Sequence, residues 1–335
     1  MISSGKGRHI KPVESPGRLS LYSMRRLEYL LGIPRERLTT LAETAGRFYE
    51  PFESSPRLRP FQRKIKQKKP RIIDNPLDEL KRIQSRINAR LLRPLYIPRY
   101  LCGGIAGRSI LDNVKMHLGA RCLVTIDIRS FFPNVTNLHI YSVWQTVLGC
   151  SPEIASLLTR LTTFERHLPQ GAPTSTMLAN LVLHMVDGPI RAECANQDVN
   201  YSTWVDDLAF SGESARYVIQ TAVTALRRGG FAVSHRKLRI MGPKDRKELN
   251  GLVVSNSVGI HPSMESQIRA GIHNLRCHKV PQECLPGYLR SLRGRIAYVS
   301  RIVPGKGARF HDALQSARDY VAMAVDKIPK RPSSD

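Results

Sequence analysis

Residues 201–210 read Tyr-Ser-Thr-Trp-Val-Asp-Asp-Leu-Ala-Phe, and the fold prediction starts from them. Apolar and aromatic residues on both sides of Asp206 and Asp207 predict a hairpin of two strands with the acids at its tip. Upstream, residues 123–126 form a short, partly β-branched apolar run that ends in Asp127. If this strand and the hairpin are neighbours in one sheet, their three carboxylates lie together.

Three carboxylates that lie together repel one another unless a cation lies between them. Mg²⁺ fits best, because it prefers hard oxygen ligands and commonly binds one or two carboxylates together with substrate phosphates. Two such ions about 3.5–4 Å apart serve an in-line displacement, which is the chemistry of nucleotide addition. An alternative interpretation makes Asp206 and Asp207 an ordinary turn pair. Their apolar surroundings favour the metal site, because uncompensated charges are costly to desolvate.

The segments around these acids predict a mixture of helices and strands. From residue 123 to 234 the expected order is strand, helix, helix, hairpin, helix, strand. This order is typical of an α+β domain with helices on one face of an antiparallel sheet. The expected strands are 123–126, the hairpin 201–210, and 231–234. The expected helices are 20–31, 35–47, 77–92, 152–161, 174–186, 215–228, 262–276, 286–301 and 309–325.

Composition indicates a folded protein with a polyanionic partner. The chain has 335 residues, 41% of them apolar, which is enough for two or three compact units with a substantial core. Its formal charge is +25. Residues 1–100 hold 23 basic and 9 acidic side chains, residues 101–200 hold 7 of each, and the rest hold 22 and 11. The densest run, residues 57–71, is either a solvated basic loop or a phosphate contact, and the charge distribution favours phosphate.

Several other classes of protein are disfavoured. No stretch approaches the ~18 apolar residues of a membrane span, and residues 1–11 lack the apolar core of a secretory signal. We therefore expect a cytoplasmic protein without a membrane partner. Six dispersed cysteines suit reduced thiols. A zinc site at residues 273–284, with two His and two Cys, matches no common spacing and is the weaker interpretation. No GxxxxGK[ST] sequence exists, which disfavours a P-loop ATPase.

Three motifs in order resemble motifs A, B and C of reverse transcriptases. They are Thr125-Ile-Asp-Ile-Arg-Ser-Phe-Phe-Pro133, Leu168-Pro-Gln-Gly-Ala-Pro-Thr-Ser175 with Leu178-Ala-Asn180, and Trp204-Val-Asp-Asp-Leu-Ala-Phe-Ser211. The resemblance includes Arg71-Ile-Ile-Asp-Asn-Pro76 and covers roughly residues 20–305. Trp204 stands where the family usually has Tyr, a departure expected to change packing beneath the primer terminus.

The bacterial retron type is the branch that the chain resembles most. Asn113-Val-Lys-Met-His117, Leu249-Asn-Gly251 and the pair Phe131-Phe132 carry this likeness. The first two elements are imperfect, so other small bacterial reverse transcriptases of phage defence remain an alternative.

The resemblance implies a right-hand polymerase fold. The implied parts are an N-terminal arm at 1–18, fingers with N-terminal helices at 19–120, a palm at 121–254 that includes part of the fingers between motifs A and B, and a helical thumb at 255–335 that binds RNA or a hybrid duplex. The palm is the α+β sheet backed by helices.

It also implies a role for each matching side chain. The two Mg²⁺ ions are expected at Asp127, Asp206, Asp207 and the Ile128 carbonyl. Lys237 is expected to protonate the leaving pyrophosphate, with a solvated lysine as the alternative. The incoming nucleotide is expected to meet Phe132 as a steric gate against the 2′-hydroxyl, Gln170 and Gly171 at the sugar, and Arg71 with Lys69 at the triphosphate. For Phe131 we favour core packing, and the alternative for residues 169–173 is an ordinary helix-entry turn.

The implied function is an RNA-directed DNA polymerase that uses dNTPs to copy a cognate noncoding RNA, serving as template and primer, into the single-stranded DNA called msDNA. A retron antiphage role, an RNA–DNA hybrid product, an effector or toxin protein and removal of the template by host RNase H belong to the same expectation. An idle RNA-binding scaffold is the alternative of another class, and a generic basic RNA-binding module is a third. The intact acids favour the enzyme, since a scaffold has no reason to hold mutually repelling charges.

Overall fold

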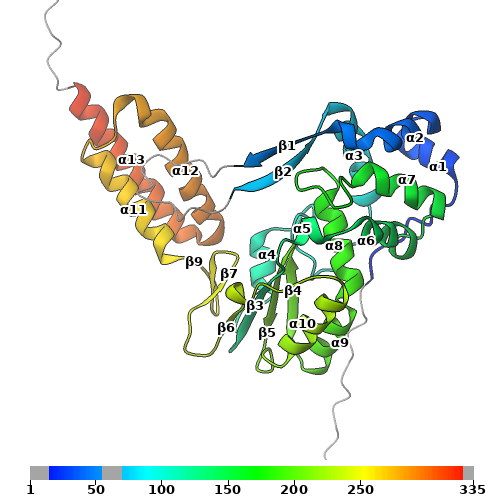
Figure 1. Ribbon diagram of the computed structural model, residues 1–335. Helices are drawn as coiled ribbons and strands as arrows, with labels where there is room; N and C mark the ends of the chain where they lie inside the picture. Colours follow the sequence, from blue (N-terminus) through cyan, green and yellow to red (C-terminus); the bar gives the residue numbers. More distant parts are fainter. Residues whose placement is uncertain (1–14, 55–69, 327–335) are drawn as a thin grey trace, which may run out of the picture. The chain divides into compact units, whose positions relative to one another are not determined.

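The computed structural model describes residues 15–54 and 70–326 (Figure 1). Their contacts divide them into two compact units. The first contains the described residues up to 245, and the second begins at Arg246. Within the described ranges, no helix combines the length and the apolar character needed to cross a membrane.

A four-stranded antiparallel sheet lies at the centre of the first unit, in the order β4-β5-β3-β6. Its strands are β3 (Leu123–Asp127), β4 (Asn200–Trp204), β5 (Asp207–Ser211) and β6 (Arg239–Met241). The inner strands β3 and β5 are almost wholly buried, as expected for apolar runs covered on both faces. The predicted α+β class with an antiparallel sheet, and its central strand and hairpin, are therefore confirmed.

Helices cover this sheet and build the rest of the core. Helix α8 is apolar nearly all round and is buried along most of its length. Helix α10 is amphipathic and buries Val218, Ala222, Ala225 and Leu226 at helical spacing. The helices of this part are α5 (Phe131–Asn134), α6 (Asn137–Ser142), α7 (Pro152–Thr162), α8 (Ser175–Val186), α9 (Gly188–Asn196) and α10 (Val218–Arg228), with short π and 3₁₀ segments at Val143–Val147 and His235–Lys237.

The N-terminal part of the first unit is helical and carries a separate two-stranded ribbon. Helix α1 ends at Leu31, where a helix is predicted to end, and the left-handed backbone of Gly32 (φ 60°) caps it. The ribbon pairs β1 with β2 antiparallel, with Ser54 opposite Arg71. The elements are α1 (Met24–Leu31), α2 (Arg35–Thr44), β1 (Tyr49–Ser54), β2 (Arg71–Pro76), α3 (Asp78–Ile87) and α4 (Ile110–Lys115), with 3₁₀ and π segments at Ala45–Phe48 and Asn88–Leu92.

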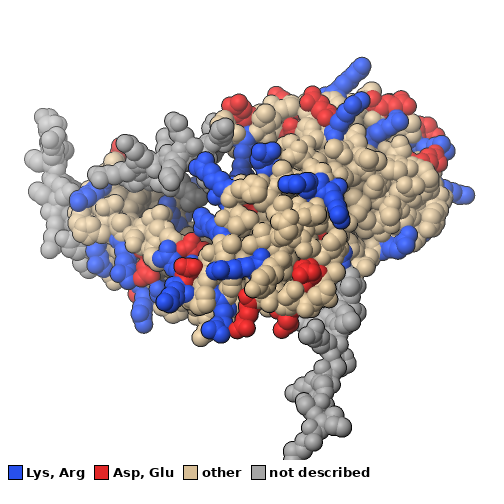
Figure 2. Space-filling view, turned by 60° about the horizontal axis from the view of Figure 1, so that its bottom comes forward, with Lys and Arg blue, Asp and Glu red and all other residues tan. Residues whose placement is uncertain are grey.

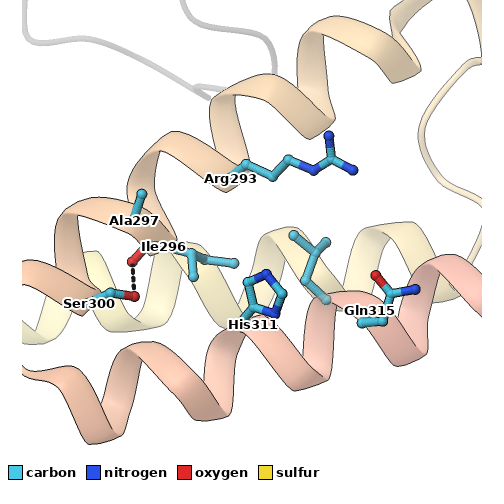
Figure 3. A pocket seen from close by; sticks show the side chains of 7 residues that line it. Arg293, Ile296, Ala297, Ser300, His311 and Gln315 are labelled. Atoms are coloured by element: carbon cyan, nitrogen blue, oxygen red, sulfur yellow. Dashed lines mark hydrogen bonds between the residues drawn. The ribbon is translucent and has the colours of Figure 1, made fainter.

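The second unit joins a small antiparallel sheet to three helices with their own apolar core. Its elements are β7 (Lys247–Leu249), β8 (Leu252–Val254), β9 (Val258–Ile260), α11 (Pro262–Arg276), α12 (Leu285–Ile302) and α13 (Pro304–Asp326), with a 3₁₀ turn at Gln282–Cys284. Helix α11 has the predicted bounds, and α13 begins five residues earlier than predicted. A largely apolar cavity of about 490 Å³ lies between α12 and α13, lined by Ile296, Leu314 and His311 among others (Figure 3).

One predicted strand is wrong. Residues 231–234 make only an isolated bridge, between Val233 and Ile128. They are held by single hydrogen bonds, Arg129 N to the Ala232 carbonyl (2.8 Å) and Ser234 N to the Asp127 carbonyl (2.8 Å). The edge of the sheet is formed instead by β6, which pairs with β3. Residues 231–234 and β6 both have a composition typical of strands. The sequence alone therefore does not show which of them pairs with β3.

Candidate active site

The sheet brings the three predicted carboxylates together. Asp127 is the last residue of β3 and lies directly opposite Asp207, the first residue of β5. Opposite residues in an antiparallel pair have Cα atoms about 4.5–5.5 Å apart. Asp206 occupies the turn between β4 and β5, and its carbonyl accepts a hydrogen bond from the Ile128 amide (2.9 Å). The turn is fixed in an uncommon form, because Val205 has a left-handed backbone (φ 60°).

The electrostatics of this cluster reflect burial and mutual repulsion. Burial, followed by the charges of Asp206 and Asp127, raises the pKa of Asp207 to about 6. Burial also raises the pKa of Asp206, and Asp127 adds to that effect, while the backbone, Lys237 and Arg71 oppose it. The ammonium group of Lys237 lies 2.5 Å from Asp127 Oδ1. Lys237 is therefore brought to the cluster, and Arg71 lies close enough to influence Asp206.

These donors fit a hard divalent cation. Hard oxygen ligands are present, and a nearby cation offsets the repulsion that raises the two pKa values. Among the side chains described in residues 15–54 and 70–317, no group of three His, Cys, Asp or Glu could by itself hold a metal ion. A cation at these acids would therefore complete its shell with water and substrate phosphates, as Mg²⁺ usually does.

The residues predicted to meet the nucleotide sugar are held by an aspartate that the sequence analysis did not single out. Asp74, in β2, accepts a hydrogen bond from the Gln170 amide (3.0 Å) at Oδ2, and its own amide donates to the Gln170 carbonyl (2.9 Å). His167 Nε2 lies 3.2 Å from the same oxygen. The adjoining Gly171 has φ 125°, and a Cβ there would lie 2.9 Å from Ile73 Cγ2. These two hydrogen bonds between Asp74 and Gln170 hold the motif B loop against the ribbon of β1 and β2, which carries Arg71.

Two neighbouring phenylalanines follow β3 with different environments. Phe131 is buried and packs edge-on against Phe231, with ring centroids 5.1 Å apart, so the core interpretation is confirmed. Phe132 is only partly buried. Its ring is thus available to a ligand in a way that Phe131 is not. Lys69 and most of the basic run 57–71 lie outside the described residues, whereas Arg71 is exposed in β2.

A buried histidine links the two strands of the hairpin that carries Asp206 and Asp207. His117 Nδ1 lies 2.7 Å from Ser211 Oγ on β5, and Nε2 lies 2.6 Å from Ser202 Oγ on β4. Burial lowers the pKa of His117 to about 4, so the ring is neutral and bridges the two strands. The sequence marks residues 113–117 only as a family likeness, and the structure adds this bridging role.

A second buried polar cluster surrounds Asp187, at the end of α8. Asp187 Oδ1 lies 2.7 Å from Arg191 Nε, and the hydroxyls of Tyr100 and Tyr201 donate to the same carboxylate. Burial raises the pKa of Asp187 to about 6, although these partners oppose the shift. No sequence signal marked this cluster, because Tyr100, the pair Asp187 and Arg191, and Tyr201 come from three separate segments.

The zinc hypothesis gains no support from the described residues. Cys277 Sγ lies 3.4 Å from His273 Nε2, but no third ligand completes a metal-binding group there. All six cysteines are free, which agrees with the expectation of reduced thiols.

Comparison with known proteins identifies the class. Residues 62–254, more than half of the chain, match the reverse transcriptase (RNA-dependent DNA polymerase) family. The chain therefore belongs to the reverse transcriptases, enzymes that are RNA-directed DNA polymerases and generally use divalent metal ions.

Curated relatives narrow the class further. The chain is 31% identical over 254 residues to the retron Ec86 reverse transcriptase of Escherichia coli, covering 72% of this chain and 79% of that protein. It is 28% identical over 191 residues to the retron Se72 enzyme of Salmonella heidelberg (strain 579083-10), covering 57% and 48%. It is 27% identical over 259 residues to the retron Mx65 enzyme of Myxococcus xanthus, covering 71% and 60%. Within its family, the chain is of the retron type.

Proposed function

We propose that this reverse transcriptase copies a structured noncoding RNA into msDNA, using that RNA as template and primer. In this proposal it serves a retron antiphage system, works with an effector protein and leaves template removal to host RNase H. Its similarity to several retron enzymes supports the proposal. The alternative is another bacterial reverse transcriptase of phage defence.

The meeting of Asp127, Asp206 and Asp207 at one end of the sheet carries the mechanism. When bound there, two Mg²⁺ ions would activate the attacking hydroxyl and stabilise the leaving oxygen. Asp127 and Asp206 are the principal ligands in this proposal, with Asp207 and the Ile128 carbonyl in support.

Residues around the acids are assigned to the substrate and the leaving group. Lys237 is poised beside Asp127, where its proton can pass to the leaving pyrophosphate. Phe132 excludes a 2′-hydroxyl, while Gln170 and Gly171 contact the sugar of the dNTP. Arg71, assisted by Lys69, grips the triphosphate.

In the proposed right-hand arrangement the central sheet is the palm, residues 19–120 form the fingers and residues 255–335 form the thumb. The thumb helices carry a basic groove of about 340 Å³ between α11 and α13. Four bases line it, together with Glu265 and apolar residues that include Phe310: Arg269, Arg276, Lys306 and Arg309. Glu265 pairs with Arg269 and Lys306, so Arg276 and Arg309 are the bases proposed to meet phosphates. Such a groove suits the phosphates of an RNA or hybrid duplex, which is recognised chiefly by shape and backbone. Lys and Arg side chains are spread over the face drawn in Figure 2, while acidic ones form a few patches.

The decisive test combines one substitution with one sequencing experiment. Asp206→Asn removes a charge from the cluster and is expected to abolish DNA synthesis on a primed RNA, with RNA affinity unchanged in a filter-binding assay. DNA synthesis by the variant at the wild-type rate would contradict the mechanism.

The second half of the test concerns the product. Nucleic acid that co-purifies with the protein from its native locus should contain one branched RNA–DNA molecule of fixed sequence. DNA without a fixed template would favour the alternative defence class. RNA without attached DNA would favour an idle scaffold.

A further inference from the structure

A short segment, residues 100–104, runs beside the catalytic hairpin, and we call it the strap. The Cys102 amide donates to the Thr203 carbonyl (2.9 Å), and the Thr203 amide donates to the Tyr100 carbonyl (2.8 Å). Leu101 forms a parallel bridge with Thr203. The strap is thus attached to β4 three residues before Asp206.

Gly103 lies against the turn that carries Asp206. A Cβ at this position would be 2.5 Å from both Val205 N and Val205 Cγ2, and 2.8 Å from the Trp204 carbonyl carbon. Two of these three atoms belong to the backbone, so a methyl group cannot be accommodated by a side-chain rotation alone. Val205 already has φ 60°, which a β-branched residue rarely adopts. The turn that carries Asp206 is therefore both strained and in close contact with the strap.

The other side of the strap is fixed to helix α8. Asn180 Nδ2 donates to the Gly103 carbonyl (2.8 Å) and to the Thr176 carbonyl (2.8 Å), and Asn180 is fully buried. Gly104 has φ 69°, and a Cβ there would meet Thr176 Cγ2 at 2.1 Å. Gly103 thus lies against the turn that carries Asp206, and Gly104 lies against α8.

The start of the strap is also anchored beside α8. The Tyr100 hydroxyl lies 2.7 Å from His184 Nδ1 on that helix and 3.3 Å from Asp187 Oδ1 directly after it. Arg191 holds Asp187 in turn. Both ends of the strap are therefore tied to the same helix.

We propose that the strap is a spacer between helix α8 and the catalytic turn, with Gly103 as its positioning residue. The absence of a Cβ at Gly103 sets how close the turn lies to the helix, and hence where the Asp206 carboxylate sits relative to Asp127. The inference rests on the proposed role of these acids in polymerisation.

The first test adds one methyl group. In Gly103→Ala, we expect kcat for dNTP incorporation on oligo(dT)-primed poly(rA) to fall about 100-fold, the loss typical of a displacement near 1 Å. The KM for dTTP and the affinity for RNA should stay at wild-type values, while the melting temperature falls because the methyl group overpacks a buried contact. Gly46→Ala is the matched control, because the same methyl group there meets no atom within 4 Å. Wild-type kcat in Gly103→Ala, or a loss of RNA affinity that parallels the loss of kcat, would overturn the proposal.

The second test does not depend on activity. The chain has two tryptophans, Trp144 and Trp204. Trp144 is fully buried, so acrylamide quenching reports Trp204, which lies in the strap contact. Gly103→Ala should change the quenching constant and Gly46→Ala should not. An unchanged constant in Gly103→Ala would show that the turn has not moved, against the proposal. If the wild-type protein makes no DNA, the polymerase proposal fails. Acrylamide quenching of Trp204 would still test whether the strap positions the turn.

A third variant opens space instead of filling it. Asn180→Ala removes the side chain that fixes the strap to α8, so it covers the case in which Gly103→Ala does not fold. We expect a lowered kcat with unchanged KM and RNA affinity. Where both variants fold, their effects on kcat should be less than additive, because both act on one contact. Wild-type kcat in Asn180→Ala, or full additivity, would contradict the spacer role.

Discussion

At the scale of single residues, Phe131 and Phe132 show how adjacent side chains of one type divide their tasks. The ring of Phe131 completes the core against Phe231, and that of Phe132 is partly exposed. Phe132→Ala removes the proposed steric gate. We expect the preference for dNTP over rNTP, measured as a ratio of kcat/KM values, to fall by on the order of 10-fold or more. Phe131→Leu should lower the melting temperature and leave the ratio of kcat/KM values unchanged. A lowered ratio in Phe131→Leu, together with an unchanged ratio in Phe132→Ala, would assign the steric gate to Phe131 instead.

Asp74 holds the main chain of Gln170, which the proposal places at the sugar of the dNTP. Asp74→Ala removes the carboxylate that receives the Gln170 amide, an interaction with a charged group worth about 1.5 kcal/mol or more. We expect the KM for dNTP to rise about 10-fold, since that energy corresponds to a factor of ten in binding. Asp74→Asn keeps an acceptor of the same size and should show a smaller rise. A KM that stays at the wild-type value in Asp74→Ala would show that the motif B loop does not need this clamp.

At the scale of elements, the central strand, the hairpin and most long helices were predicted because their apolar spacing is local information. Helix α11 even has its predicted ends, which Pro262 and the following apolar positions mark. The ribbon of β1 and β2 was missed because nearly all its residues are exposed or polar, so no alternation shows. The strands β7, β8 and β9 were missed because each is only three residues long.

The candidate site shows the same difference between features that local spacing reveals and features that depend on remote contacts. Motif spacing was enough to select the three acids, and the pairing of β3 with β5 brings Asp127 and Asp207 together. The supporting residues escaped notice because their partners are remote in sequence. Asp74 meets Gln170 across 96 positions, and His117 meets Ser211 across 94. Contacts of that range depend on the folded chain and leave no periodic signal.

His117 also predicts a pH dependence. Its pKa in the folded protein is about 4, below the ordinary value of 6.5, so the unfolded chain binds more protons between these pH values. Stability should therefore fall as the pH drops, by about 2 kcal/mol between pH 7 and pH 5 from this residue alone. His184 acts in the same direction, and Asp187, with its raised pKa, acts in the opposite one.

Comparison with a variant isolates the contribution of His117. Urea unfolding of wild-type protein and His117→Gln at pH 7 and pH 5 should show a smaller loss in the variant, because glutamine does not titrate. Equal losses in both proteins would mean that His117 is not kept neutral by burial.

At the scale of the whole molecule, the charge of +25 predicts RNA binding that depends strongly on salt. A protein that contacts 6 to 10 phosphates loses roughly 10³- to 10⁵-fold in affinity between 50 and 200 mM salt. We expect this enzyme to fall in that range. The double change Arg276→Gln and Arg309→Gln in the basic groove should reduce the slope of log K against log salt by about 2. Arg121→Gln is the control, because Glu213 already pairs with that side chain at 3.1 Å. An unchanged slope in the double variant would exclude the groove as a phosphate contact.

The ion pair between Lys237 and Asp127 places a positive charge on an expected metal ligand without any bound ion. Lys237 is 62% exposed, so its ammonium group has room to turn from Asp127 toward the leaving pyrophosphate that the proposal assigns to it. Chelation with EDTA should stop synthesis while leaving the melting temperature unchanged, which differential scanning fluorimetry would measure. The folded state is thus expected to tolerate loss of the metal, because Lys237 offsets the charge of Asp127 in its absence.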